Sequence, residues 1–379
     1  MSSSLEVVIA GGGSPGHVYP GLAIADALRA RMPDVSILFA GTGRPLERHL
    51  VRAAGYNHMA LPAKPAPHNP LEAVRFLTDN ALGFMAAAWM LREQHTSLVV
   101  GLGGYAGATT VRAAVGRGIP TVLLEQNATT GRMTKWLSGM VETVCTGFKE
   151  VAPCLSPVAD IVHTGTPARP RFIKQYHHWQ QQGEAERKSR EPRIVVLGGS
   201  GGAQTLNNHM PEVVSRLTEE LKDWRIVHQT GEGQLQTTED RYPSDTSQIL
   251  TVSYIDELAS LLFETDIVVC RAGGTTLAEL ALAGVPAVVV PFPDAADNHQ
   301  MANAEVYREA GACVVVDEWA AGDRLTDELT NQVRALAADH ERRDEMRRAM
   351  RSLARPDAAE AIATRCCEIL CGADVQVAA

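Results

Sequence analysis

Short apolar runs alternate with longer segments of helical pattern along most of the chain. The runs are rich in β-branched residues and end in glycine-containing or polar loops, as strands buried on both faces of a parallel sheet do. They predict strands at 5–10, 36–40, 58–61, 97–102, 121–126, 143–146 and 161–164, then at 194–197, 225–229, 249–253, 267–270, 286–292 and 313–316. Helices are expected between most of them, and three more at 327–338, 342–353 and 358–370. The pattern predicts an α/β fold of two doubly wound, Rossmann-like lobes.

The stretch 266–300 combines a strand, a glycine turn, a helix, a second strand and a polar loop. Residues 272–274 let the chain turn, and Thr275 or Thr276 is expected to cap the helix. The positive end of this helix would favour a diphosphate, and Glu279 could accept hydrogen bonds from ribose hydroxyls. The final loop carries polar groups suited to sugar hydroxyls. The alternative interpretation is an ordinary βαβ unit with a polar loop.

Another glycine-rich turn, residues 11–17, follows the first predicted strand. It fits G-x-G-x-x-G, but the second strand does not end in the acidic residue of a dinucleotide site, so NAD is not expected. It also fits the G-x-S-x-G of a nucleophile elbow around Ser14, but Pro15 removes an N–H from the usual oxyanion hole. His17 lies where a helix begins, which favours a neutral, proton-accepting imidazole. His17 is therefore either a general base or a capping or packing histidine.

Further loops are expected to meet that turn at the carboxyl ends of the strands, where ligands of such sheets bind. Residues 103–107 open a helix with two glycines, and Asn127 offers a neutral amide to a hydroxyl or carbonyl group. In the second half, residues 198–203 repeat the glycine-rich design, which favours two similar lobes over two serine nucleophiles. Arg169 follows a turn at a strand end and is a candidate diphosphate contact, and Ile255 could present its backbone to a base ring.

Composition narrows the class of protein. The 379 residues are 45% hydrophobic and 21% charged with a net charge of −9, so a globular protein without a nucleic-acid partner is expected. Residues 1–165 carry 13 Lys and Arg against 11 Asp and Glu, a balance of +2, which leaves −11 for the remainder. The first half could therefore approach an anionic surface. Seven scattered cysteines fit reduced thiols in a cytoplasm, and no signal peptide is expected.

Two segments bear on organisation. Residues 81–91 are apolar but too short to cross a bilayer, so they form either a core helix or a helix with one face left for lipid. The polar stretch 169–193 has little apolar periodicity and is expected to be a solvated linker. The predicted domains are an N-terminal lobe at 1–168, a linker at 169–192, a C-terminal lobe at 193–355, and a final helix at 356–379 that packs back on the first lobe.

Motifs over nearly the whole chain resemble the MurG family, the N-acetylglucosamine transferases of bacterial peptidoglycan synthesis. They include GGGSPGHVYPGLAIADAL, GTGRPLERHLV, GLGGYAGATTVRAA, EQNATTGRMTKWLS, GGSGGAQTLNN, DIVVCRAGGTTLAEL and PFPDAADNHQMANA. The resemblance implies a GT-B fold with a cleft between its lobes, and transfer from UDP-N-acetylglucosamine to an undecaprenyl-diphosphate-linked muramyl-pentapeptide, lipid I to lipid II, with inversion. No bound metal or other cofactor is implied.

The resemblance also implies places and roles. The enzyme would be peripheral, at the cytoplasmic face of the bacterial plasma (inner) membrane, and would serve cell shape and division beside other cell-wall synthesis proteins. His17 matches the region of the proposed base. The substrate contacts map to Ser14, Pro15, Gly16, Asn127, Arg169, Ser200, Ile255, Gly274, Thr275, Thr276, Leu277, Ala278, Glu279 and Gln300. Ser14 and Pro15 replace the family's usual Thr and Gly, and the N–H lost at Pro15 would cost about 1.5–3 kcal/mol of phosphate binding.

Two alternatives stand beside this interpretation. One is a different UDP-sugar enzyme of the same fold, either a glycolipid transferase or a UDP-N-acetylglucosamine 2-epimerase. The other is a non-catalytic nucleotide-sugar-binding subunit of a cell-wall complex. Because fold alone does not fix function, turnover and product analysis must separate them.

Overall fold

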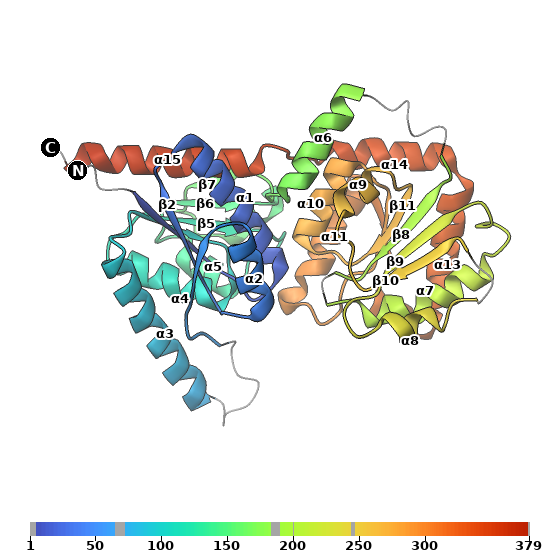
Figure 1. Cartoon of the computed structure of the whole chain (residues 1–379), viewed down its shortest axis with the longest axis horizontal. Coiled ribbons are helices and arrows are strands. Elements are labelled where there is room, and N and C mark those ends of the chain that lie inside the picture. The colour runs from blue at the N-terminus through green and yellow to red at the C-terminus, as the bar shows by residue number, and fades with distance from the viewer. Residues whose placement is uncertain (1–4, 65–72, 183–189, 200, 244–246, 378–379) are drawn as a thin grey trace. The chain divides into compact units, whose positions relative to one another are not determined.

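The computed structural model describes residues 5–64, 73–182, 190–199, 201–243 and 247–377 (Figure 1). The chain divides into two compact units. Unit 1 comprises Met1–Arg169 together with Asp357–Ala379, and unit 2 comprises Pro170–Pro356. Each unit is built around its own parallel sheet.

Unit 1 contains a seven-stranded sheet in the order β3-β2-β1-β4-β5-β6-β7 within the described residues. Its strands are β1 (Glu6–Ala10), β2 (Ser36–Gly41), β3 (Asn57–Ala60), β4 (Leu98–Gly101), β5 (Thr121–Glu125), β6 (Thr143–Thr146) and β7 (Ile161–His163). Its helices are α1 (Pro15–Arg31), α2 (Pro45–Ala53), α3 (Ala73–Glu93), α4 (Gly104–Val115), α5 (Arg132–Leu137), the 3₁₀ helix η2 (Lys149–Cys154) and α15 (Ala358–Val377). The strand order reverses between β1 and β4, the type of switch point where doubly wound sheets bind ligands.

Unit 2 repeats this topology with the described order β10-β9-β8-β11-β12-β13. Its strands are β8 (Arg193–Leu197), β9 (Arg225–Gln229), β10 (Ile249–Val252), β11 (Ile267–Cys270), β12 (Ala287–Val289) and β13 (Cys313–Val315). Its helices are α6 (Pro170–Gln182), α7 (Gln204–Arg216), α8 (Leu235–Glu239), α9 (Leu258–Phe263), α10 (Gly274–Ala283), η4 (Ala296–Asn298), α11 (His299–Glu309), α12 (Glu318–Ala321), η5 (Gly322–Arg324), α13 (Leu325–Ala338) and α14 (His340–Ser352). The predicted α/β fold with two Rossmann-like lobes is confirmed, and the switch point here lies between β8 and β11.

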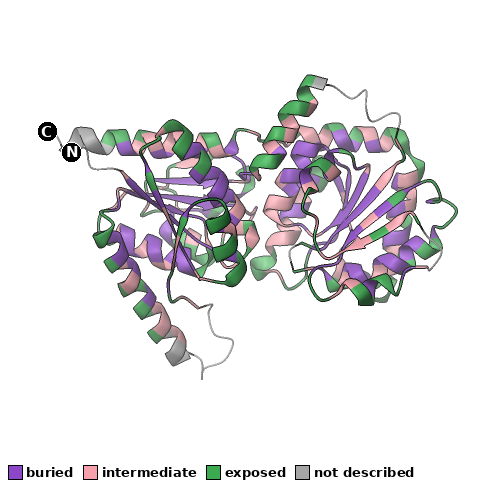
Figure 2. Ribbon diagram, in the orientation of Figure 1, coloured by how far each residue is buried: buried purple, intermediate pink, exposed green. Residues whose placement is uncertain are grey.

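The cores form because the central strands are apolar on both faces. Strands β1, β4 and β11 are buried along their whole length, and Figure 2 shows the central strands of both sheets in the colour of buried residues. Parallel pairing is continuous in each sheet, with Val8 opposite Val99 in unit 1 and Val269 opposite Val196 in unit 2. This register places the carboxyl ends of the central strands at a common edge.

Helix α15 completes the core of unit 1 from the far end of the sequence. Ile362 and Cys366 are fully buried in the cluster that contains Ile24 and Leu28 of α1. Ion pairs flank this apolar seam, since Arg31 Nε lies 2.9 Å from Glu360 Oε2 and Arg365 pairs with Asp160.

The expectation of a solvated linker over 169–192 is wrong for its first part, because residues 170–182 form α6. The next part of the predicted linker, 183–189, lies outside the described residues. Phe172, Tyr176 and Trp179 recur at helical spacing and give an otherwise polar segment one apolar face. Phe172 is 1% exposed, and the Arg351 guanidinium lies 3.7 Å from the centre of the Trp179 ring. Helix α6 packs against α9 and α10, so burial of a single face is sufficient to order it.

Replacing Ile362 by alanine is expected to destabilise unit 1 by about 2–4 kcal/mol, because the substitution leaves a cavity in the core of this unit. In this variant, calorimetry should show unit 1 unfolding at a lower temperature than unit 2, and hydrogen exchange should be faster in unit 1. Cys371→Ser on the exposed side of the same helix is the control and should change little. Equal effects of the two substitutions would contradict the packing described for α15.

Candidate active site

The carboxyl edge of the unit 1 sheet brings together loops that lie far apart in the sequence. Gln126 Nε2 donates to the Leu102 carbonyl at 3.4 Å, which joins the loop after β5 to the end of β4. A Cβ added to Gly103 would lie 3.5 Å from Nε2 of His17, and one on Gly104 would lie 3.2 Å from the Gly12 carbonyl. The first glycine turn and the start of α4 are therefore in close backbone approach.

His17 lies in the first turn of α1, beside the N-terminus of α4. Its Nδ1 is 3.0 Å from Oγ of Ser14, which is the N-cap residue of α1 but makes no side-chain capping bond. When Nδ1–H donates to the Ser14 oxygen, Nε2 keeps its lone pair. Gly103 is the N-cap of the twelve-residue helix α4, whose positive end favours the neutral imidazole. The arrangement can accept a proton from a hydroxyl group.

The turn at 11–16 is a poor phosphate cradle. The Gly11 N–H donates to the Ala40 carbonyl, the Gly13 N–H to Glu47, and Pro15 has no N–H. The N–H of His17 is also bonded, to the Ser14 carbonyl. The glycines thus serve close packing, and a diphosphate contact through Ser14, Pro15 and Gly16 has few backbone donors to draw on.

The side chain of Glu47 holds this turn in place, and the sequence patterns did not reveal this role. Glu47 is 4% exposed, and its carboxylate accepts hydrogen bonds from the Gly13 N–H at 2.9 Å, the Thr42 hydroxyl at 2.7 Å and His58 Nε2 at 2.8 Å. A Cβ on Gly12 would come within 2.5 Å of it. Burial by itself raises the pKa of Glu47, but the bonds from His58, Thr42 and Gly13 outweigh it and hold the pKa below its ordinary value.

A second buried carboxylate fixes the loop that carries Asn127. Glu125 is 5% exposed and accepts hydrogen bonds from the Asn127 N–H at 3.1 Å and the Gly131 N–H at 3.4 Å. Burial raises the pKa of Glu125, opposed by these bonds. The position of Asn127 is thereby set by the residue two places before it.

Arg169, the candidate diphosphate contact, ends unit 1. Its guanidinium carbon lies 5.0 Å from the centre of the Tyr19 ring on α1. An aromatic face orients an arginine without neutralising its charge. The structure thus anchors Arg169 to the helix that carries His17.

In unit 2, α10 begins at Gly274 with Gly273 as its N-cap, so the expected cap by Thr275 or Thr276 is wrong. Gly273 has extended backbone dihedrals and needs no side chain to turn the chain, which places both threonines inside the first turn. Leu277 is also a poor ligand contact, because its side chain is fully buried and its N–H donates to the Gly273 carbonyl.

Glu279 lies on the second turn of α10 and is 3% exposed. Ala278 beside it is half-buried. A carboxylate in this position would be a strong acceptor for a ligand hydroxyl, because the surrounding protein excludes water.

Gln300 and Asn303 clamp the peptide that precedes α10. Gln300 Oε1 accepts hydrogen bonds from the N–H of Ala272 at 3.1 Å and of Phe292 at 3.0 Å. Asn303, which is fully buried, donates to the Ala272 carbonyl at 3.1 Å. The side-chain oxygen of Gln300 is therefore occupied by two backbone N–H groups, and its side-chain N–H₂ is the group that can contact a ligand.

The glycine turn after β8 packs directly on the neighbouring strand end. Gln229 Nε2 donates to the Gly199 carbonyl at 2.7 Å, and a Cβ on Gly202 would lie 2.1 Å from the Thr230 carbonyl. Only glycine fits such an approach. Ser200 lies outside the described residues, and Ile255, after β10, is half-buried.

A buried polar network holds this strand end, and sequence reasoning missed it. Asn207 Nδ2 donates to the Thr230 carbonyl at 2.9 Å and to Gln234 Oε1 at 2.7 Å, so Asn207 Oδ1 must accept. His228 Nε2 is 3.0 Å from that oxygen and carries the proton, and His228 Nδ1 accepts from the Tyr242 hydroxyl at 2.8 Å. Burial lowers the pKa of His228 to about 4. The ring is neutral, and every polar atom of it is paired.

The two units match the two halves of one enzyme family. The glycosyltransferase family 28 N-terminal domain corresponds to residues 7–146 and the family 28 C-terminal domain to residues 193–362. Two parallel-sheet, Rossmann-like units of this kind form the GT-B fold, and the family 28 match makes this chain a glycosyltransferase of that fold.

Similarity to individual proteins shows which glycosyltransferase family this is. A UDP-N-acetylglucosamine–N-acetylmuramyl-(pentapeptide) pyrophosphoryl-undecaprenol N-acetylglucosamine transferase of Anaeromyxobacter dehalogenans (strain 2CP-C) is 35% identical over 367 residues, covering 97% of this chain and 93% of the relative. The crystal structure of Acinetobacter baumannii MurG is 25% identical with a TM-score of 0.73, covering 95% and 98% of the two chains. The UDP-GlcNAc 2-epimerase from Neisseria meningitidis, at 12% identity and a TM-score of 0.66 over 96% and 100%, shares the fold alone. The chain therefore belongs to the MurG family of glycosyltransferases.

The network around His228 makes the stability of unit 2 depend on pH. The pKa of this histidine falls from about 6.5 unfolded to about 4 folded, so the unfolded chain binds the extra proton. Stability is complete above pH 6.5 and declines as the pH falls toward 4, by roughly 3 kcal/mol in total. Denaturant unfolding between pH 8 and 4 measures it. His228→Gln keeps a donor and an acceptor but cannot titrate, so its stability should lack this decline; an unchanged pH dependence would count against the assignment.

Proposed function

We propose that this chain transfers N-acetylglucosamine from UDP to the 4-hydroxyl of a lipid-linked N-acetylmuramyl-pentapeptide diphosphate, with inversion at the anomeric carbon. The observation that carries the proposal is the 35% identity to a named transferase of this specificity, which extends over 97% of the chain and so includes both units. Each unit has its own strand edge lined by polar groups, which supports a separate binding role for each unit. Unit 1 takes the acceptor and unit 2 takes UDP-N-acetylglucosamine.

His17 is the proposed general base. Its Nε2 faces the start of α4, while Ser14 Oγ at Nδ1 orients the ring. Accepting the proton of the attacking hydroxyl makes that oxygen a better nucleophile as the bond to the sugar forms. The neutral ring that this step requires is favoured by the positive end of α4. Asn127, held by Glu125, would bind a hydroxyl or carbonyl group of the sugar next to it.

Unit 2 would stabilise the departing nucleotide. Charge accumulates on the diphosphate as the sugar leaves, and the N-terminal turn of α10, at Gly274–Thr276, presents a positive helix end to it. The amide N–H₂ of Gln300 would add a donor. Glu279 would bind the ribose hydroxyls, and the backbone at Ile255 would meet the uracil ring. The helix ends do the work that a metal ion does in other transferases.

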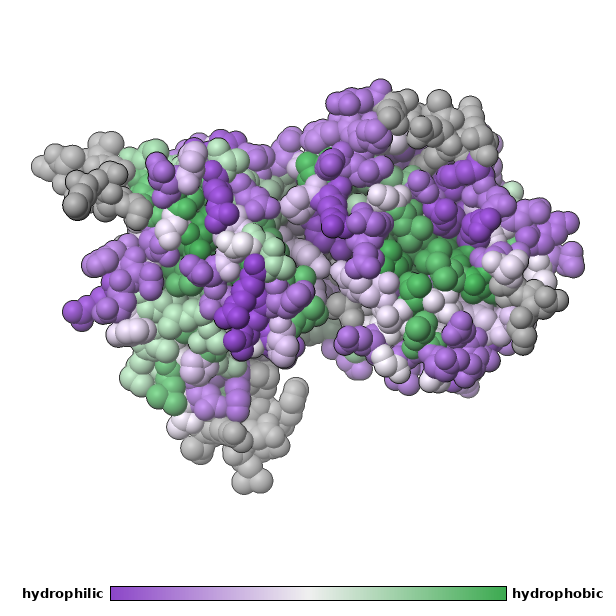
Figure 3. Space-filling view, viewed as in Figure 1, coloured by the Kyte–Doolittle hydropathy of each residue, from purple (hydrophilic) through white to green (hydrophobic). Residues whose placement is uncertain are grey.

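A peripheral position on the cytoplasmic face of the bacterial inner membrane fits the surface of α3. Ala87, Met90 and Leu91 of this helix are buried, but Leu82, Met85 and Trp89 are 52%, 58% and 59% exposed. Figure 3 shows apolar surface over α3. Among the described residues, no helix has the length and apolarity of a membrane span. The one-sided apolar face supports contact with lipid, where the acceptor resides.

Transfer by the purified protein is the direct test. With UDP-N-acetylglucosamine and a lipid-linked muramyl-pentapeptide, we expect UDP and the disaccharide product, and full activity in excess EDTA. Complete loss in EDTA would contradict the role given to the helix ends. UDP-sugar epimerised without acceptor would identify a 2-epimerase instead, and binding without any turnover would identify a silent subunit.

Replacing Glu279 by glutamine should raise the KM for UDP-N-acetylglucosamine about tenfold or more, because hydrogen bonds to a charged group are worth roughly 1.5–3 kcal/mol. The KM for the acceptor should stay within twofold. Initial-rate kinetics with each substrate varied measure both constants. Glu309→Gln, an exposed position on the neighbouring α11, is the control. An unchanged donor KM would remove Glu279 from the ribose site.

A further inference from the structure

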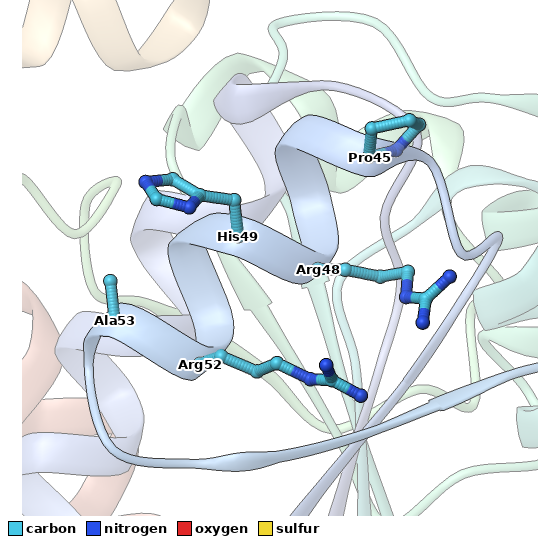
Figure 4. A pocket seen from close by; sticks show the side chains of 5 residues that line it. All are labelled: Pro45, Arg48, His49, Arg52 and Ala53. Atoms are coloured by element: carbon cyan, nitrogen blue, oxygen red, sulfur yellow. The ribbon is translucent and has the colours of Figure 1, made fainter.

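Helix α2 has an unusually basic surface. Arg44, Arg48, His49 and Arg52 are all exposed, and the only acidic residue of the helix, Glu47, is turned into the protein. Figure 4 shows the side chains of Arg48 and Arg52 on one side of α2 and His49 on the other, around a surface pocket whose lining also includes Pro45 and Ala53. The pocket therefore collects positive charge without any acid.

The stability of the fold does not explain this arrangement. Arg48 and Arg52 are four residues apart on one helix face, where like charges repel by a few tenths of a kcal/mol. Within the described part of the chain neither has an ion-pair partner, whereas Arg31 and Arg365 of the same unit pair with Glu360 and Asp160. An external anion would relieve the repulsion.

The helix is fixed to the turn that carries the proposed base. Arg44 Nη1 donates to the Gly13 carbonyl at 2.7 Å, and Glu47 accepts from the Gly13 N–H at 2.9 Å. At 1.5 Å per residue, Arg48 is about 6 Å and Arg52 about 12 Å along the axis from Arg44. The basic side chains thus begin beside the glycine turn and lead away from it.

We propose that Arg48, His49 and Arg52 form a subsite for the carboxylates of the acceptor's pentapeptide. This inference rests on the proposed function. The acid of a muramyl sugar is its point of attachment to the peptide, so the far end of the peptide is a free carboxylate. A sugar held at His17 places the peptide's start near the turn, and five extended residues span up to about 17 Å. Arginine side chains within that distance can bind carboxylates through paired N–H donors.

The test uses the full-length protein and two acceptors, both muramyl-pentapeptide diphosphates with a short lipid that needs no membrane. One has free peptide carboxylates and in the other they are amidated. For the double variant Arg48→Gln with Arg52→Gln, the KM for the free-acid acceptor should rise about five- to tenfold, since each exposed charge pair contributes a few-fold. The KM for UDP-N-acetylglucosamine, the kcat and the KM for the amidated acceptor should stay within twofold.

Two variants control the measurement. Arg48→Lys with Arg52→Lys keeps the charge and should restore most of the lost affinity. Arg117→Gln removes an exposed arginine beyond the far end of α4 and should have no effect. An equal rise in KM for both acceptors, or no rise for either, would overturn the subsite. The same variants are also assayed with an acceptor in anionic vesicles. A defect confined to that assay would overturn the subsite as well, because it would assign these cations to a membrane surface. Failure of the wild-type protein to use either acceptor would instead refute the proposed function itself.

Discussion

The close approach of glycine turns and helix N-termini at the carboxyl edge of a parallel sheet is the constraint on which this structure depends. In unit 1 the turn after β1 meets the start of α4 with His17 beside Gly103, and in unit 2 the turn after β8 meets the end of β9 at Gly202 and Thr230. At Gly202 the contact leaves no room for a Cβ, and at Gly104 a Cβ would lie only 3.2 Å from the Gly12 carbonyl. These contacts concentrate helix dipoles and polar side chains at one edge of each sheet, so the chemistry of each unit is a consequence of its topology.

Buried polar side chains hold these turns in place. Glu47 binds the backbone of the first turn, Glu125 binds the loop of Asn127, and Asn303 with Gln300 binds the peptide before α10. Each group satisfies backbone atoms that would otherwise be buried without partners, at a cost of about 1–3 kcal/mol apiece. The residues expected to touch substrate are therefore positioned by buried side chains, of which only Gln300 is itself expected to touch it.

The strands were predictable because each is a short apolar run closed by glycine or polar residues, and the chain alternates them with helices throughout. The network of Asn207 and His228 was not, because its members come from different elements and the spacing along the chain carries no signal of their contact. Helix α6 was missed because three aromatic residues at helical spacing are easily lost in a polar composition. For α10, the threonines suggested a side-chain cap, but the extended backbone of Gly273 made one unnecessary.

We propose that helix ends and donor side chains, rather than a metal ion, hold the diphosphate of the nucleotide on unit 2. A crystal structure with UDP bound tests it most directly. We expect the diphosphate at the first turn of α10, beside Gly274 and Thr276, with the ribose at Glu279 and the amide of Gln300 within hydrogen-bond distance. A diphosphate bound through a cation, or bound away from the start of α10, would contradict it.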